Sequence, residues 1–286
     1  MNLILSLFVV VAVSILSSLA YSSEHKKVLI ISDIDDTLKV SHVLHPLYAA
    51  PRIPNYTVRF SGMAQLFQLL SREPNTITRF AYISNAPKEI AGTTAFGDAH
   101  LHFLTHNKFP GGVLSLREDL FDKNHKINEI RKQVRIEKPD VIVFVGDNGQ
   151  RDSEIYLQAT RELQHRNIQL VTFIHQVYKT ERSMFDGVLF PEIGNKLLTG
   201  QVGYVTPVEI ALELHQNGIL SQQALSWMIE HVAPNIAAEK FYFSDSMNNI
   251  TFPSFMNCSE FVWRWPITEE LVPLVKKIKS ACYGLF

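Results

Sequence analysis

The sequence predicts an α/β fold in which a parallel sheet carries helices on both faces, followed by a helical and aromatic C-terminal region. From Val28 onward, short apolar runs alternate with segments of helical spacing, which is the pattern of parallel strands joined by crossover helices. The 286 residues are 46% hydrophobic and 19% charged, a balance typical of globular proteins. The alternation weakens after about residue 180, where the C-terminal region is expected to begin.

The apolar patterns predict five strands with helices between them. The strands are expected at residues 28–34, 79–84, 113–116, 141–145 and 168–174, and the helices at residues 62–72, 87–107, 126–135 and 153–165. The run from Val141 to Val145 is apolar throughout, as a strand buried on both faces requires. The proline-rich segment 41–61 does not suit a helix and is expected to form a flap over the strand ends.

Residues beyond 180 predict further helices and an aromatic cluster. Residues 206–209 combine an N-cap threonine with proline and glutamate at the first and third helical positions. A second helix is expected from Ser221 to about His231, before Pro234. The aromatic residues that follow are expected to form a core, with contact to a membrane interface as the alternative. Cys258 and Cys282 would pair in an oxidising compartment, or remain two thiols.

The N-terminal segment is almost unbroken in its apolar character. Leu3 to Ala20 contains no charged residue, and small residues follow, as in a signal peptide with its cleavage site. We therefore expect residues 1–22 to be a signal peptide and the protein to be exported, either secreted or periplasmic. No Lys or Arg precedes the run, which is about long enough to span a bilayer. An uncleaved membrane anchor at residues 3–20 is the alternative.

The acidic run from Asp33 to Thr37 directly follows the first apolar run. Carboxylates this close repel one another unless a cation or a reacting group compensates their charge. On an extended chain Asp33 and Asp35 point to the same side, and the carboxyl end of a strand is where open α/β sheets bind ligands. The run predicts a nucleophilic aspartate beside a second aspartate and a hard cation. An acidic turn that caps the strand is the alternative.

Three further polar clusters follow later strands or begin helices. They are Ser84-Asn85, His125-Lys126, and Gly146-Asp147 with Asp152. Strand ends in a parallel sheet converge on one crevice, so these side chains are expected to meet the acidic run. A cation is unfavourable at the start of a helix, and Lys126 therefore indicates an anion nearby.

This set of side chains suits phosphoryl transfer. Asp33, Asp35, Asp147 and Asp152 are expected to bind Mg²⁺, which takes carboxylates and keeps sites for water or substrate oxygens. Asp33 would attack phosphorus, and Asp35 would protonate the leaving alcohol and later activate water. Lys126 and Ser84 would stabilise the phosphoryl group. The formal net charge of −1 gives no support for binding nucleic acid.

The four clusters resemble the four motifs of the haloacid dehalogenase (HAD) superfamily of aspartate-nucleophile phosphatases. More narrowly, residues 32–39, 84–87, 125–126 and 146–156 resemble the App1-type phosphatidate phosphatase catalytic domain, and the resemblance covers about residues 27–178. It implies a HAD-like, Rossmann-like sheet, Mg²⁺ and hydrolysis of a phosphomonoester in lipid metabolism. We expect a HAD-like catalytic domain at residues 27–180 and a helical extension packed on it at residues 181–286. Asn148 and Ala86 stand where this subfamily is expected to have serine.

The resemblance implies phosphatidate or a similar lipid phosphate as the preferred substrate, with contact to a membrane surface as a further expectation. The same chemistry on a soluble phosphomonoester or a phosphoprotein is one alternative, and a non-catalytic secreted binding protein is another. The residues expected to contact the substrate are Asn85, Thr37, Arg151 and Lys39. For Arg151 and Lys39 the alternative is an ordinary surface charge.

The region that is expected to be helical before residue 107 also carries three histidines. His102 and His106 are one helical turn apart, a spacing that permits metal binding, but no acid or cysteine is in register with them. We therefore expect His100, His102 and His106 to form a solvated or partly packed helix face.

Overall fold

A computed structural model of the chain describes residues 25–45, 49, 54–89, 94–119, 121–181, 193–239, 258 and 260–283. The predicted signal peptide, the centre of the predicted flap and the aromatic residues 241–255 lie outside these ranges. Within them, no helix combines the length and the apolar character needed to cross a bilayer.

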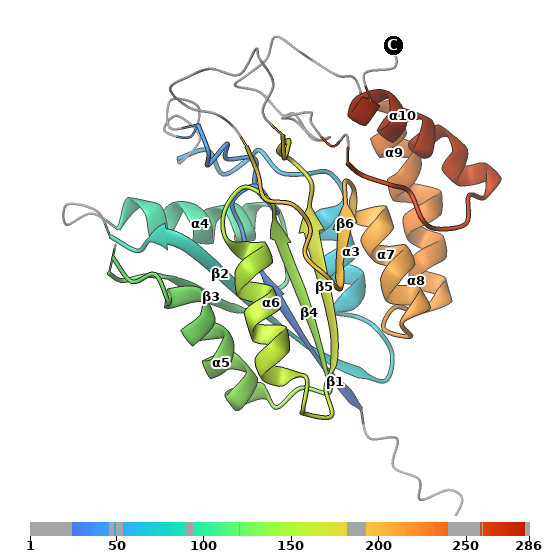
Figure 1. Ribbon diagram of the computed structural model, residues 1–286. Helices are drawn as coiled ribbons and strands as arrows, with labels where there is room; N and C mark the ends of the chain where they lie inside the picture. The colour runs from blue at the N-terminus through green and yellow to red at the C-terminus, as the bar shows by residue number, and fades with distance from the viewer. Residues whose placement is uncertain are drawn as a thin grey trace, which may run out of the picture.

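The sheet in the described residues has six strands, all of them parallel. They are β1 (Lys26–Ser32), β2 (Thr76–Pro87), β3 (Val113–Arg117), β4 (Val141–Asp147), β5 (Gln169–His175) and β6 (Gln201–Tyr204). Their order is β3-β2-β1-β4-β5-β6, so β1 and β4 lie side by side at the centre (Figure 1). This architecture confirms the predicted α/β fold class.

Strand β6 is an addition to the five predicted strands. Its four residues, Gln-Val-Gly-Tyr, pair with β5 at the edge of the sheet. A segment this short, with an internal glycine, has a sequence that hardly predicts a strand. Its pairing with β5 stabilises it as a strand. The sheet therefore continues beyond residue 180, which was the predicted end of the catalytic domain.

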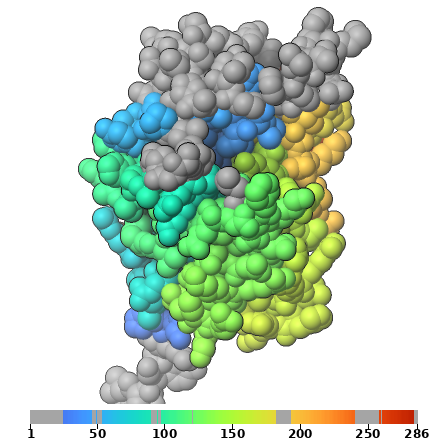
Figure 2. Space-filling model, turned by 90° about the vertical axis from the view of Figure 1, so that its left-hand side faces the viewer, coloured from blue at the N-terminus to red at the C-terminus, as the bar shows by residue number. Residues whose placement is uncertain are grey.

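Helices cover both faces of the sheet. One face carries α5 (His125–Glu137) and α6 (Asp152–Leu163). The other carries α3 (Met63–Leu70), α4 (Ala95–His106), α7 (Pro207–Gln216) and the C-terminal helices. Figure 2 looks at the β3 edge of the molecule, where the green surface belongs largely to α5 and its neighbours.

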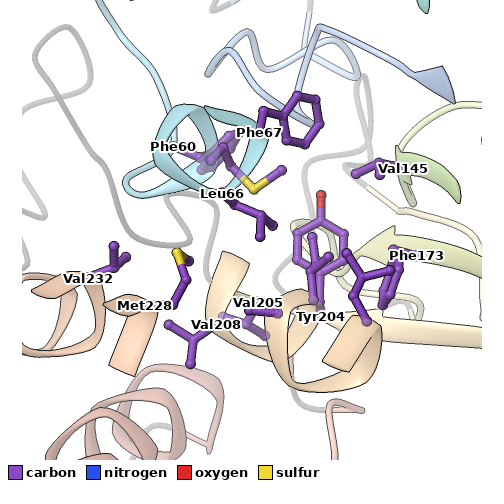
Figure 3. Packing of buried hydrophobic residues seen from close by; sticks show 14 of the residues in the cluster. Phe60, Leu66, Phe67, Val145, Phe173, Tyr204, Val205, Val208, Met228 and Val232 are labelled. Atoms are coloured by element: carbon purple, nitrogen blue, oxygen red, sulfur yellow. The ribbon is translucent and has the colours of Figure 1, made fainter. Parts of the chain in front are cut away.

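Alternation along the strands produces these two cores. Leu29 and Ile31 of β1 pack toward α5 and α6, whereas Val28 and Ile30 belong to the core on the opposite face. The second core joins the sheet to α3, α7 and the helices after it (Figure 3). Each fully buried apolar side chain contributes about 1.5–3 kcal/mol to folding, so the C-terminal helices and the sheet stabilise each other.

The helix predicted from Ser221 does not stop before Pro234. It runs as α8 (Gln222–Trp227), one turn of π-helix, η2 (Met228–Val232), and α9 (Ala233–Ala238). Pro234 lies in the first turn of α9, where the missing N–H of proline costs little, and the π turn before it realigns the chain. The Thr206 helix start is confirmed, with its capping box, at α7.

The chain ends in η3 (Glu269–Leu271) and α10 (Val272–Tyr283). Cys282 of α10 forms a disulfide with Cys258, which confirms that the two cysteines pair. Phe261 and Trp265 are buried in the core on the same side of the sheet. These two aromatic residues are therefore part of the hydrophobic core, which was one of the two predicted alternatives.

Candidate active site

The carboxyl ends of β1 and β4 bring the predicted acidic residues together. Asp33 directly follows β1, and its N–H donates to the carbonyl of Val145 in β4. Asp147 is the last residue of β4. Because β1 and β4 are neighbours in the sheet, Asp147 returns to the carboxyl edge beside Asp33, although it lies more than a hundred positions further along the chain.

Three buried carboxylates meet at this edge. Asp33, Asp147 and Asp152 each offer an oxygen atom, and these three atoms lie within 4.8 Å of one another. Asp152 is the first residue of α6 and packs against Gly146, where an added Cβ would lie 2.6 Å from Asp152 Oδ2. Glycine at position 146 therefore leaves the room that this carboxylate occupies.

Lys126 is the buried cation beside these acids. It is the second residue of α5 and is 1% exposed. Its Nζ donates to Asp33 Oδ1 over 2.7 Å and also donates to Asp152 Oδ1. The position of Lys126 at a helix start predicted an anion nearby, and these two carboxylates are that anion. We call Asp33, Asp147, Asp152 and Lys126 the carboxylate cluster.

The carboxylate cluster has an excess of negative groups. Burial raises the pKa of Asp33 to about 8, and the attraction of Lys126 opposes this rise. Burial and repulsion from Asp152 and Asp33 raise the pKa of Asp147 well above its usual value. Burial alone would lower the pKa of Lys126, but its two carboxylate partners raise it overall. Ionising all three acids thus requires more positive charge than Lys126 supplies.

This geometry fits a metal ion. The three oxygen donors are close enough to share one ion, and Asp152 Oδ2 is buried without a hydrogen-bond partner. Such an unpaired buried oxygen is costly unless another group satisfies it. Thr37 lies between two of the acids, with Oγ1 3.4 Å from Asp33 Oδ2 and 3.5 Å from Asp147 Oδ2. Thr37 is therefore a partner of the carboxylates, and its predicted contact with the substrate stays a prediction.

Asp35 lies apart from the carboxylate cluster. Its Oδ1 accepts a hydrogen bond from Ser41 Oγ over 2.6 Å, and its Oδ2 lies 3.2 Å from Ser84 Oγ and 2.9 Å from His100 Nε2. We call Ser41, Ser84 and His100 the Asp35 donor group. Burial would raise the pKa of Asp35, but His100, the charge of Lys39 and the hydrogen bond from Ser41 outweigh it and hold that pKa well below its usual range.

The prediction that the Asp35 carboxylate binds the metal ion is therefore not supported by its position. Among the described residues, the carboxylates that could share an ion are those of Asp33, Asp147 and Asp152. Both oxygens of Asp35 already accept hydrogen bonds from other side chains. The period-two spacing places Asp33 and Asp35 on one side of an extended chain, but β1 ends at Ser32, so that periodicity does not extend to Asp35.

Ser84 reaches the site but is bonded to Asp35. Its Oγ also accepts the N–H of Ala86 over 3.0 Å. In the structure its hydroxyl therefore orients the Asp35 carboxylate, and the predicted contact of Ser84 with a phosphoryl group stays a prediction.

The remaining predicted substrate contacts have different surroundings. Asn85 is partly buried, and its Nδ2 lies 3.4 Å from Gln150 Oε1. Arg151 is exposed and pairs with Glu154 along α6, which matches an ordinary surface charge. Lys39 is only 1% exposed, so its side chain is packed inside the protein and not presented to solvent. Direct contact of Lys39 with a head group would need this packing to open.

Asp36 organises the backbone beside the site. Its carboxylate accepts hydrogen bonds from the N–H groups of Ser41, His42 and Val43 and from the hydroxyl of Tyr178. These bonds tie the start of the predicted flap to the end of β1. Asp36 is fully buried, and burial raises its pKa to about 6. It therefore acts as a structural residue.

Asn148 also acts on the backbone. Its Oδ1 accepts the N–H groups of Val177 and Tyr178, and its Nδ2 donates to the carbonyl of Tyr178. Asn148 is 1% exposed, and these three hydrogen bonds hold the segment after β5 in place.

His100 differs from the solvated or partly packed helix face that was expected. His102 and His106 are exposed, as expected for a solvated helix face, but His100 is 2% exposed and bonded to Asp35. A signal was present: His100 precedes Phe103 and Leu104 by three and four residues, so it lies on the buried stripe of α4. That spacing predicts burial, but the sequence gives no indication that Asp35 is its partner.

The chain also matches a known protein family. Residues 28–175 match the family described as phosphatidate phosphatase APP1, catalytic domain, over just more than half of the chain. The chain belongs to this family. The matched region contains all the residues of the carboxylate cluster and of the Asp35 donor group. Membership of the APP1 family confirms the predicted resemblance.

Other comparisons add little to the APP1 family assignment. One solved structure, that of the Pnkp1/Rnl/Hen1 RNA repair complex, is similar over 51% of this chain and 42% of its own, with 14% sequence identity and a TM-score of 0.32. So slight a likeness carries no argument about this protein. No curated protein matches the chain.

Proposed function

We propose that this APP1-family enzyme hydrolyses the phosphomonoester of phosphatidate, or of a similar lipid phosphate, through an aspartyl-phosphate on Asp33 and with Mg²⁺. The observation that carries the proposal is the carboxylate cluster at the carboxyl edge of the sheet, with Asp33 held by Lys126 and Asp35 two residues away. The family description supports the lipid substrate.

The residues around Asp33 suit Mg²⁺, a hard cation that prefers carboxylate oxygens. Asp33, Asp147 and Asp152 would hold it. When bound, it would neutralise the charge of these acids and of the phosphoryl oxygens. The raised pKa of Asp33 and of Asp147 supports this proposal, because a nucleophilic carboxylate must be ionised and added positive charge would favour the ionised form.

The first half of the reaction uses Asp33 and Asp35. A carboxylate oxygen of Asp33 attacks phosphorus, and the bond from phosphorus to the leaving oxygen breaks. Asp35 would give its proton to that oxygen, so the alcohol leaves neutral. In the protein alone Asp35 is ionised, and the negative charge of a bound phosphate group would raise its pKa so that it can carry this proton. Lys126 donates to Asp33 Oδ1 over 2.7 Å, whereas Thr37 Oγ1 lies 3.4 Å from Oδ2, so Oδ2 is the less tightly held oxygen and the better placed to attack.

The second half returns the enzyme to its starting state. Asp35, now a carboxylate, takes a proton from water as the water oxygen attacks phosphorus. The bond from phosphorus to Asp33 breaks and inorganic phosphate leaves. The side chain of Asp35 is 17% exposed, whereas that of Asp33 is 5% exposed. This difference supports the assignment of Asp35 as the group that exchanges protons with water and with the leaving alcohol.

We also propose that the protein is exported. The apolar run at residues 3–20 and the disulfide between Cys258 and Cys282 support this, because disulfides persist mainly in oxidising compartments. Fractionation of cells that express the full chain would test it, and recovery only from the cytosol would contradict it.

The test of the proposed activity compares substrates. Purified protein with Mg²⁺ should release phosphate from phosphatidate in detergent micelles faster than from soluble sugar or nucleotide phosphates. Asp33→Asn should lower turnover by at least about a thousandfold, and Asp98→Asn, at an exposed position on α4, should leave it unchanged. Faster phosphate release from the soluble phosphates would favour the alternative, a phosphatase that acts on soluble phosphomonoesters. Mg²⁺ binding with no turnover of any substrate would contradict the proposed activity.

A further inference from the structure

Tyr204 ends strand β6, outside the residues that match the APP1 family. Its register partner in β5 is His175, and the register partner of His175 in β4 is Asp147. Register partners in neighbouring strands point to the same face of the sheet, because side chains alternate along each strand. Asp147, His175 and Tyr204 therefore form one row at the carboxyl edge of the sheet, and Tyr204 lies two strands away from a member of the carboxylate cluster.

The side chain of Tyr204 is fixed inside the protein. It is 0% exposed, and its ring stacks on that of His175, with 4.6 Å between the ring centroids and 9° between the ring planes. The ring of Phe173 lies 6.5 Å away in a T-shaped arrangement. In Figure 3 the hydroxyl of Tyr204 points away from Val205 and Val208. These ring contacts hold the hydroxyl in one direction, so it cannot turn to solvent.

The buried hydroxyl of Tyr204 has no hydrogen-bond partner among the described residues. Two other buried tyrosines differ from it. The hydroxyl of Tyr156 donates to the carbonyl of Val145 over 3.1 Å, and that of Tyr178 donates to the carboxylate of Asp36. A buried hydroxyl without a partner costs free energy. The position of Tyr204 therefore indicates a partner that binds from outside the chain.

The charges of the carboxylate cluster act on this hydroxyl. Burial raises the pKa of Tyr204 well above its usual value, and the charges of Asp147 and Asp33 raise it further. The hydroxyl therefore keeps its hydrogen atom and is available as a donor. Asp152 Oδ2 is a second buried atom of this region without a partner in the described residues. A hydrated cation bound at this edge of the sheet would satisfy both atoms.

We propose that Tyr204 is a positioning residue of the metal site, whose hydroxyl donates a hydrogen bond to a water molecule in the hydration shell of the cation. This inference rests on the proposed function, in which Asp33, Asp147 and Asp152 hold Mg²⁺. Mg²⁺ keeps several of its water molecules when it binds to a protein, and groups that form hydrogen bonds around a metal ion strengthen its binding by orienting its shell. The water gives the hydroxyl its missing acceptor, and the hydroxyl fixes the position of the water.

Thermal denaturation of the full chain, followed from excess chelator to saturating Mg²⁺, tests this role without measuring turnover. The variant is Tyr204→Phe, which removes the hydroxyl and keeps the ring. The control is Tyr82→Phe, at a buried position where the lost hydroxyl donates to the carbonyl of Pro110 over 2.7 Å. Two quantities are measured: the midpoint of denaturation in chelator, and the Mg²⁺ concentration that gives half of the maximal rise in the midpoint.

We expect the two variants to differ in both quantities. Tyr204→Phe should raise the half-maximal Mg²⁺ concentration about tenfold, and its midpoint in chelator should not fall, because no hydrogen bond within the protein is lost. Tyr82→Phe should lower the midpoint in chelator, because the carbonyl of Pro110 loses its donor, and should leave the half-maximal concentration unchanged. Phosphate release should need about tenfold more Mg²⁺ in Tyr204→Phe and should reach the wild-type kcat at saturating Mg²⁺.

An unchanged half-maximal Mg²⁺ concentration in Tyr204→Phe would overturn the proposal, whatever the midpoint of that variant in chelator. Failure of the proposed function would look different, because Mg²⁺ would then leave the midpoint of the wild-type protein unchanged and the wild-type protein would release no phosphate. A wild-type protein that Mg²⁺ stabilises and that releases phosphate, with the same half-maximal concentration in Tyr204→Phe, would contradict only the role of Tyr204.

Discussion

Asp33 and Asp35 are two residues apart in the chain, and their carboxylates lie in two contrasting surroundings. In the carboxylate cluster, three buried acids surround one lysine, and burial raises the pKa of Asp33 to about 8. Asp35, in contrast, faces the histidine and two hydroxyls of its donor group and the charge of Lys39, and its pKa lies well below the usual range despite its burial.

The contrast shows that partners, and not residue type or depth of burial, set the properties of these acids. Burial acts on both carboxylates in the same direction, and the number of donors relative to acids decides the outcome. A site short of positive charge suits a metal ion, and a site rich in donors suits an acid that must keep one orientation. The predictions below test this division.

The largest effect is expected from Lys126→Met. It removes the buried cation of the carboxylate cluster and leaves two hydrogen-bonded acids without their partner. We expect the free energy of unfolding to fall by about 3–5 kcal/mol and phosphate release to fall by up to about a thousandfold, measured by urea denaturation and turnover. Lys132→Met, at an exposed pair with Glu129 on the same helix, should change neither. Wild-type activity in Lys126→Met would contradict the importance of the cluster.

Asp35→Asn should lower activity more than stability. Asparagine keeps the shape of the side chain but cannot donate the proton, so turnover of an alkyl phosphate should fall by about a hundredfold. Thermal denaturation should show a modestly lower midpoint, because the amide nitrogen cannot accept the hydrogen bonds that one carboxylate oxygen accepts. Unfolding of Asp35→Asn under native conditions would show instead that the donor group serves mainly the stability of the protein.

Addition of Mg²⁺ should distinguish the two surroundings directly. At a Mg²⁺ concentration one hundred times its dissociation constant, the free energy of unfolding should rise by about 2.7 kcal/mol, and a chelator should reverse the rise. Asp147→Asn should abolish the effect, because it removes a donor of the cluster. Asp35→Asn should retain it, and loss of the Mg²⁺ effect in that variant would show that the Asp35 carboxylate is a ligand after all.

The smallest effect is expected from Ser41→Ala. The change removes one hydrogen bond to Asp35 Oδ1 and leaves Ser84 and His100 in place. A single hydrogen bond contributes about 1 kcal/mol, so turnover of the alkyl substrate should fall about fivefold. A loss as large as that of Asp35→Asn would show that Ser41 has a direct part in proton transfer.

Much of the fold and of the carboxylate cluster was predictable because both follow local rules. Apolar runs such as residues 141–145 indicate buried strands, and parallel strands bring their carboxyl ends to one edge. Asp33 and Asp147 each lie at such an end, so their meeting follows from the topology. The position of Lys126 at a helix start indicated an anion nearby, and the structure contains it.

The Asp35 donor group could not be predicted in the same way. Ser41, Ser84 and His100 come from a loop, a strand and a helix on one face of the sheet, and no spacing in the sequence links them. The packing of α4 decides that His100 turns inward, and the end of β1 at Ser32 separates Asp35 from Asp33. The burial of Lys39 and the pairing of β6 with β5 likewise depend on distant contacts.

The sequence by itself determined the fold class, the strand ends and the acids that meet there, because hydrophobic periodicity and parallel topology are local and repeat along the chain. Only the tertiary structure decided which acid has which partners. Hydrogen bonds and charge interactions act over a few ångströms, between groups that the chain separates by long stretches, 142 residues in the case of Asp36 and Tyr178. Asp33 and Asp35 have the same side chain and nearly the same place in the sequence, and three-dimensional packing gave them different roles.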